Sequence, residues 1–184
     1  MVDENTINLL ETITKQKKND LIIFTTFTFD PIFFDAYMLR ILQKNNPDAT
    51  IIILMDFKQY TKIKDEFTEV TGREYVLIPI DSKQVFHSKI FMFISDKKTQ
   101  TILGSHNLTF SGIVQNLELC FNSDDDDLFK NCISYVYSVL EKNLDSKDSL
   151  FEKITPYVNS KTKNQKLLTN ENEGILDQCL KSVS

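Results

Sequence analysis

Two short stretches of the chain hold the residues that decide its fold and its chemistry. They read Val85-Phe86-His87-Ser88-Lys89-Ile90-Phe91-Met92-Phe93-Ile94 and Leu103-Gly104-Ser105-His106-Asn107-Leu108-Thr109. The first predicts a strand from His87 to Ile94 on which His87 and Lys89 face the same side, because strand side chains alternate between faces. The second predicts a turn directly after a further strand. Imidazole, ammonium, amide and hydroxyl groups can therefore converge on one spot.

The apolar pattern around these stretches predicts an α/β fold. Continuous apolar runs such as residues 50–55 are typical of strands buried on both faces of a sheet. The full prediction places helices at residues 5–18, 31–42, 57–71 and 127–143, and strands at residues 20–27, 50–55, 74–80, 87–94, 99–103 and 115–121. This order favours an α/β/α sandwich with a mixed β-sheet.

Length and composition fit one main domain with an appended segment. With 184 residues, of which 41% are hydrophobic and 26% charged, the chain can bury a sizeable core. The composition turns polar after Leu144, so we expect a folded domain at residues 1–144. Residues 145–184 are expected to form a polar linker and a short helical C-terminal extension, with the helix at residues 174–181.

Composition also bears on location and partners. The N-terminus is acidic, and no apolar run approaches the ~20 residues of a membrane span, so we expect a cytoplasmic protein without membrane contact. The three cysteines are unevenly spaced, which favours free thiols and argues against structural zinc. The net charge of −5 is unfavourable for nucleic-acid binding. Four of the negative charges, however, are concentrated at residues 124–127.

The converging polar groups suit phosphodiester cleavage without a metal. Such cleavage needs a nucleophile, groups that neutralise the phosphate oxygens, and an acid for the leaving alkoxide. The neutral imidazole of His87 is a competent nucleophile, and Lys89 offers a fixed positive charge. Asn107 offers amide donors and Ser105 a hydroxyl, while Gly104 allows close backbone approach.

These residues resemble the signature of the phospholipase D superfamily, which is His-x-Lys followed by Gly-Ser-x-Asn and a downstream Glu. The matching segments are His87-Ser88-Lys89, Gly104-Ser105-His106-Asn107-Leu108-Thr109 and Asn116-Leu117-Glu118. The resemblance implies a phospholipase D-like sandwich and a phosphodiesterase with no metal or cofactor. It implies that His87 is the nucleophile or acid, that Lys89 and Asn107 bind phosphate, and that Ser105 assists them.

The remaining site residues are also assigned through this resemblance. Glu118 is implied to orient the catalytic histidine, with a solvent-facing strand residue as the alternative. Gly104, Thr109 and His106 are assigned to substrate binding. His106 occupies the variable position of the turn, so we expect it at the surface or in the groove rather than as a catalyst.

One departure from the signature favours a nuclease. The family's Asp, usually five residues after the Lys, falls on Ile94 here, and Asp96 lies two positions too late. Some nuclease branches, including metal-independent restriction endonucleases, also lack this Asp and use the downstream Glu. The resemblance thus indicates a nuclease acting on DNA rather than RNA, in bacterial restriction or antiviral defence, with further subunits of a defence complex as partners.

The single copy of the motif predicts a homodimer. Members of the superfamily use two His-x-Lys motifs that face each other, so a chain with one motif must pair with a second copy through a twofold axis. Two alternatives stay open. One is a catalytically silent scaffold subunit of a larger complex. The other is a lipid phosphodiesterase, although no membrane-docking helix rich in Lys and Arg is evident.

Overall fold

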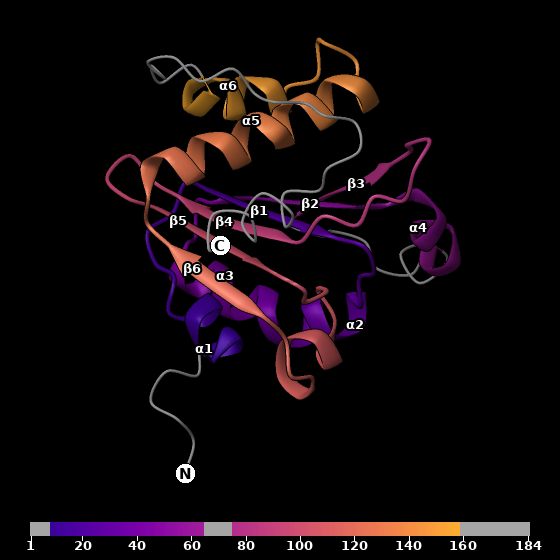
Figure 1. The fold of residues 1–184 in the computed structure, drawn as a ribbon. Coiled ribbons are helices and arrows are strands. Elements are labelled where there is room, and N and C mark those ends of the chain that lie inside the picture. Colours follow the sequence, from indigo (N-terminus) through magenta and orange to yellow (C-terminus); the bar gives the residue numbers. More distant parts are fainter. Residues whose placement is uncertain (1–7, 65–74, 159–184) are drawn as a thin grey trace, which may run out of the picture.

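The computed structural model describes residues 8–64 and 75–158, in which a mixed sheet is covered by helices on both faces (Figure 1). The strands are β1 (Leu21–Thr26), β2 (Thr50–Asp56), β3 (Val76–Ile80), β4 (Ile90–Ile94), β5 (Thr99–Gly104) and β6 (Cys120–Ser123). They form a six-stranded sheet in the order β3-β2-β1-β4-β5-β6. The pairs among β1, β2 and β3 are parallel, and those from β1 through β4 and β5 to β6 are antiparallel. The predicted α/β/α sandwich with a mixed sheet is confirmed.

Helices lie on both sides of this sheet. They are α1 (Leu9–Thr14), α2 (Pro31–Phe33), α3 (Leu39–Asn45), α4 (Phe57–Ile63), α5 (Asp126–Asn143) and α6 (Leu150–Val158), with π-helical segments η1 (Phe34–Met38) and η3 (Ser111–Gln115). Figure 1 shows α5 and α6 above the sheet and α1 to α3 below it. The side chains of Asp30, Asp56 and Asp125 accept backbone N–H groups at the starts of α2, α4 and α5, which fixes where these helices begin.

The centre of the sheet is buried on both faces. All six residues of β1 are buried, because alternate side chains enter two separate apolar clusters. Ile22 and Phe24 pack on the side of α1 to α3, and Leu21 and Ile23 pack on the side of α5 and α6. The buried strands β1 and β4 therefore hold in place the residues that follow β1 and those that precede β4.

Two predicted strands begin later than expected. β4 starts at Ile90 rather than His87, because the backbone pairing of β1 with β4 ends at Phe24 opposite Phe91. In the stretch predicted as a strand at 115–121, Gln115 ends η3, residues 116–119 are irregular, and β6 starts at Cys120. Its alternating apolar pattern indicated a strand, but Leu117 is fully exposed and pairs with no strand of the described residues. The other predicted strands are confirmed within two residues at each end.

Helix α6 was not predicted. Its residues Leu150, Phe151 and Ile154 are buried in the cluster that α5 forms with the sheet. The division of the chain at Leu144 stays a prediction. The predicted linker at 160–172, the helix at 174–181, and the end of the helix predicted over 57–71 lie outside the described residues. Among the described residues, none forms a helix that combines the length and apolar character needed to cross a bilayer.

Candidate active site

His87 and Lys89 meet in the extended segment that leads into β4. The Lys89 Nζ lies 2.9 Å from Nδ1 and 3.4 Å from Nε2 of His87, and it donates to the His87 carbonyl oxygen at 3.1 Å. Lys89 is only 7% exposed, whereas His87 is exposed. The imidazole packs against the ring of Phe27, with the two centroids 4.8 Å apart. A held positive charge thus lies beside an accessible imidazole.

This environment favours the neutral form of His87. Partial desolvation and the Lys89 ammonium lower the pKa of His87, and together they outweigh the Asp56 carboxylate, which raises it. Burial lowers the pKa of Lys89, while Glu118 acts to raise it. A neutral imidazole retains the nitrogen lone pair that a nucleophilic attack needs.

Asp56 is a neighbour of this segment that the sequence analysis missed. It ends β2, is 4% exposed, and accepts the N–H of Phe86 at 3.1 Å with one oxygen and that of Gln59 at 3.1 Å with the other. A single buried carboxylate thus begins α4 and fixes the residue before His87. The available signal was an Asp between a strand and a helix, which indicates a helix cap and not a link to His87.

The turn after β5 brings Ser105 to Glu118. The Ser105 hydroxyl donates to the Glu118 carboxylate and accepts the N–H of Leu119 at 3.1 Å. The side-chain amide of Asn116 donates to Glu118 at 3.1 Å. The Ser105 bond is the main cause of the lowered pKa of Glu118. Within the described residues, Glu118 bonds Ser105 and Asn116 and not His87, so its role in orienting the histidine stays a prediction.

Asn107 and Thr109 lie in the same turn. The N–H of Thr28 donates to Asn107 Oδ1 at 3.4 Å, and the Asn107 amide nitrogen makes no hydrogen bond to the described part of the chain. Its N–H donors are therefore available to an anion. The Thr109 hydroxyl accepts the N–H of Gly112 at 3.1 Å and holds the start of η3. Substrate binding by Thr109 stays a prediction.

The expectation that His106 lies at the surface or in the groove is wrong. His106 is fully buried, and its ring packs edge-on against Phe91 with centroids 4.5 Å apart. Neither ring nitrogen has a hydrogen-bond partner among the described residues, and burial lowers the pKa of His106 to about 4. The imidazole is therefore neutral at neutral pH and cannot contact a substrate in this conformation.

Gly104 is required by packing around this histidine. A Cβ atom at Gly104 would lie 2.3 Å from the carbonyl oxygen of Leu119 and 2.4 Å from Nδ1 of His106. Both distances are far below van der Waals contact, so any side chain would displace the turn. The glycine lets β5 and the Glu118 segment approach closely, and its assignment to substrate binding stays a prediction.

The expectation that Asp96 does not replace the missing Asp of the signature stays a prediction. Ile94 occupies that position and is fully buried, whereas Asp96 is exposed in the turn after β4. A carboxylate whose charge acts on His87 is that of Asp56, which comes from a different strand.

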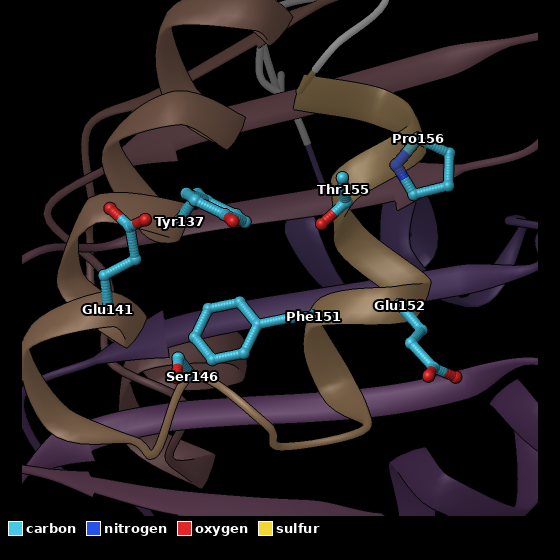
Figure 2. Close-up of a pocket in the computed structure, with 7 residues that line it drawn as sticks. All are labelled: Tyr137, Glu141, Ser146, Phe151, Glu152, Thr155 and Pro156. Atoms are coloured by element: carbon cyan, nitrogen blue, oxygen red, sulfur yellow. The ribbon is translucent and has the colours of Figure 1, made fainter.

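An open groove of about 710 Å³ lies elsewhere, between α5 and α6 (Figure 2). Tyr137 and Phe151 meet there with ring centroids 5.4 Å apart. The groove contains none of the predicted site residues, and its charged lining residues, Glu141 and Glu152, are acidic and do not suit a phosphate. In the described ranges, no three or more His, Cys, Asp and Glu side chains form a cluster that could hold a metal ion.

Comparisons with known proteins agree with this fold. NucT from Helicobacter pylori gives a TM-score of 0.52 at 15% identity, covering 72% of this chain and 85% of that one. Nuc from Salmonella typhimurium, a phospholipase D family member, gives 0.53 at 16% identity, covering 76% and 89%. Phosphatidylserine synthase from Haemophilus influenzae Rd KW20 gives 0.50 at 12% identity, covering 85% and 41%. A search of curated protein sequences found no match.

A family model covers most of the chain. The model described as "Cardiolipin synthase, PLD-like domain" matches residues 9–139, which include His87, Lys89, Ser105, Asn107 and Glu118. The solved structures of NucT and Nuc are similar to this chain in fold. The chain therefore belongs to the phospholipase D superfamily, whose members are typically phosphodiesterases.

Proposed function

We propose that the protein is a metal-independent phosphodiesterase that cleaves DNA through a covalent phosphohistidine at His87. The observation that carries the proposal is the contact of 2.9 Å between the exposed imidazole of His87 and the buried ammonium of Lys89. It places a neutral nucleophile beside a fixed positive charge, which suits attack on an anionic phosphodiester.

The proposed reaction consists of two displacements at phosphorus. A ring nitrogen of neutral His87 forms an N–P bond while the P–O bond to the leaving alcohol breaks, and the departing oxygen takes a proton from a second histidine that is in its protonated, imidazolium form. Water then attacks phosphorus, gives a proton to that second imidazole, and breaks the N–P bond to return neutral His87. In both steps the Lys89 ammonium offsets the negative charge of the phosphate oxygens, and the amide of Asn107 donates hydrogen bonds to them.

We propose that the second imidazole is the partner subunit's His87 in a homodimer. The chain has two histidines, and the other one, His106, is fully buried. A twofold axis near the site would pair two equivalent His87 side chains. Leu117 and Leu119, on either side of Glu118, are 100% and 71% exposed, and apolar surface of this kind is typical of a protein contact.

A mixing experiment tests the shared site. Wild-type chains and His87→Ala chains are produced together in equal amounts, so that subunits combine at random. If each site needs both His87 side chains, only about one quarter of the dimers stay active. Activity that falls only by half, in proportion to the wild-type chains, would contradict a shared site.

The choice of DNA rests on the resemblance to metal-independent restriction endonucleases without the signature Asp. The same resemblance supports a setting in bacterial restriction or antiviral defence, with partner subunits that supply DNA contacts to a chain whose net charge is −5.

The test of the function is cleavage of single-stranded and double-stranded DNA by the purified protein in excess EDTA, beside His87→Ala. RNA of the same sequence and vesicles containing cardiolipin serve as competing substrates. Cleavage of DNA that resists EDTA and is lost in the variant is expected. Cleavage of RNA or lipid instead would overturn the proposal that DNA is the substrate. A wild-type protein that cleaves none of these substrates would favour the alternative of a catalytically silent scaffold subunit.

A further inference from the structure

Two adjacent threonines at the end of β1 connect the two halves of the candidate site. Thr25 and Thr26 are both fully buried, and they face opposite sides of the sheet because strand side chains alternate. Buried hydroxyl groups in a strand that otherwise reads Leu-Ile-Ile-Phe need hydrogen-bond partners. Their partners are the two segments that carry the signature.

Thr25 holds the segment that contains His87 and Lys89. Its hydroxyl oxygen accepts the N–H of Ile90 at 2.8 Å, just where the backbone pairing of β1 with β4 ends. The same hydroxyl lies 2.9 Å from the Ser88 hydroxyl, and the two share a hydrogen bond. Ser88 stands between the two functional residues, so this bond fixes the direction in which the segment leaves the sheet.

Helix α5 also comes near this serine. The Ser88 side chain acts to lower the pKa of Tyr135 in α5, while burial, the larger cause, raises it. The variable residue of the His-x-Lys motif is thus held by its hydrogen bond to Thr25, with Tyr135 of α5 nearby. A hydrogen-bonded residue in this place restricts the motions of His87 and Lys89 on either side of it.

Thr26 holds the turn that contains Asn107. Its oxygen accepts the N–H of Leu108 at 2.9 Å, and its hydroxyl donates to the carbonyl of Thr28 at 2.6 Å. Thr28 in turn donates its N–H to Asn107 Oδ1 at 3.4 Å. The Thr26 hydroxyl therefore holds the backbone of the residue after Asn107, and it also holds Thr28, which in turn orients the side-chain amide of Asn107.

We propose that Thr25 and Thr26 are positioning residues that fix the distance between the nucleophile and its phosphate ligand. Thr25 sets the His87 segment, Thr26 sets the Asn107 turn, and the rigid end of β1 joins them. The inference deepens the proposed phosphodiesterase function and rests on it. Neither threonine touches the substrate, since both are fully buried.

Matched substitutions separate the hydroxyl from the shape of the side chain. Valine at either position keeps the branched shape and removes the hydrogen bonds, whereas serine keeps the hydroxyl. The full chain in EDTA is measured for the pKa of His87 by NMR, for binding of inorganic phosphate, and for kcat and KM with bis(4-nitrophenyl) phosphate. The presence of only two histidines makes the ring signals simple to assign.

The two valine variants are expected to differ in what they change. Thr25→Val shifts the pKa of His87 and lowers kcat by up to about 100-fold, because small misplacements of a reacting group have effects of this size. Thr26→Val leaves the pKa of His87 unchanged and weakens phosphate binding by about tenfold, as the loss of one hydrogen bond implies. Thr25→Ser and Thr26→Ser restore the wild-type values.

Wild-type behaviour of both valine variants would overturn the inference, and so would equal effects of both variants on every readout. If a valine variant does not fold, Ser88→Ala replaces the first and Thr26→Cys the second, and wild-type values in these variants overturn it as well. The titration of His87 and the binding of phosphate can be measured without any cleavage. If the two valine variants differ in these two measurements but the protein cleaves no phosphodiester, the proposed function is refuted and the positioning role of the threonines stands.

Discussion

The two histidines of this chain lie nineteen positions apart, at residues 87 and 106, but in opposite environments. His87 is exposed, contacts the Lys89 ammonium at 2.9 Å, and packs against Phe27. His106 is fully buried against Phe91, and its ring nitrogens have no hydrogen-bond partner within the described residues. Both have a lowered pKa, but only the first imidazole can reach a substrate.

Access and neighbouring charge, and not the residue type, therefore separate the chemical role of His87 from the packing role of His106. The exposed histidine lies before a strand, where hydroxyl and carboxylate groups of other strands hold its segment. The buried one fills the space beneath the turn that carries Asn107 and Ser105. Substitutions at the two positions are therefore expected to change different properties.

The largest expected effect is on cleavage at the exposed histidine. His87→Ala should lower kcat by at least about 1,000-fold, since it removes both the nucleophile and, in a dimer, the acid. His106→Leu should retain most of the cleavage, because its side chain does not meet the substrate. DNA cleavage in EDTA with both variants measures the contrast, and equal losses would contradict the division of roles.

The next effect is on stability in acid, and it belongs to the buried histidine. Burial lowers the pKa of His106 from 6.5 to about 4, so the unfolded state takes up the proton first as the pH falls. The free energy of unfolding should therefore decrease between about pH 6.5 and pH 4, by about 3 kcal/mol in total, and then level off. Urea unfolding across this range measures the decrease. His106→Leu should flatten it, and an unchanged slope in that variant would contradict the burial of a neutral ring.

A loss of stability smaller than this acid effect is expected when a side chain is added at Gly104, next to the buried ring of His106. Gly104→Ala places a Cβ atom 2.3 Å from the Leu119 carbonyl and 2.4 Å from the His106 ring. We expect it to lower the free energy of unfolding by about 1–3 kcal/mol, as overpacking commonly does. Val114→Ala, at an exposed position of η3, is the control and should change it by less than about 0.5 kcal/mol. Similar melting curves for the two variants would show that the turn can relax.

The smallest effect concerns the charge beside the exposed histidine. Lys89→Met removes the ammonium that helps to lower the pKa of His87, so this pKa should rise towards its usual range. NMR titration of the His87 ring signals measures the change, with Lys83→Met, at an exposed position, as the control. A pKa that stays where it is in Lys89→Met would mean that desolvation alone lowers it.

Much of the fold could be predicted because its signals are local. The apolar runs of β1 and β2 are long and continuous, and Pro31 and the capping aspartates mark where helices begin. The residues of the signature could also be found, because the signature is defined by residue types at fixed spacings along the chain. The structure brings His87 to Lys89 and Ser105 to Glu118.

The parts that could not be predicted depend on contacts between distant segments. The start of β4 at Ile90 depends on the hydroxyl of Thr25, which lies 65 positions earlier in the chain. The burial of His106 depends on Phe91 in β4, and the carboxylate near His87 comes from Asp56 in β2. At residues 115–121 the sequence has the alternating apolar pattern of a strand, but no distant segment in the described part of the chain covers Leu117 and Leu119, which remain exposed.

The most direct test of the central claim is to trap the covalent intermediate. A reaction with labelled DNA in EDTA is stopped in alkali, which preserves phosphohistidine, and is then digested with trypsin. Cleavage after Lys83 and Lys89 releases residues 84–89 with His87, whereas His106 lies in residues 99–130. We expect a nucleotide adduct on residues 84–89 alone. An adduct on residues 99–130, or EDTA-resistant cleavage with no adduct on either peptide, would contradict it.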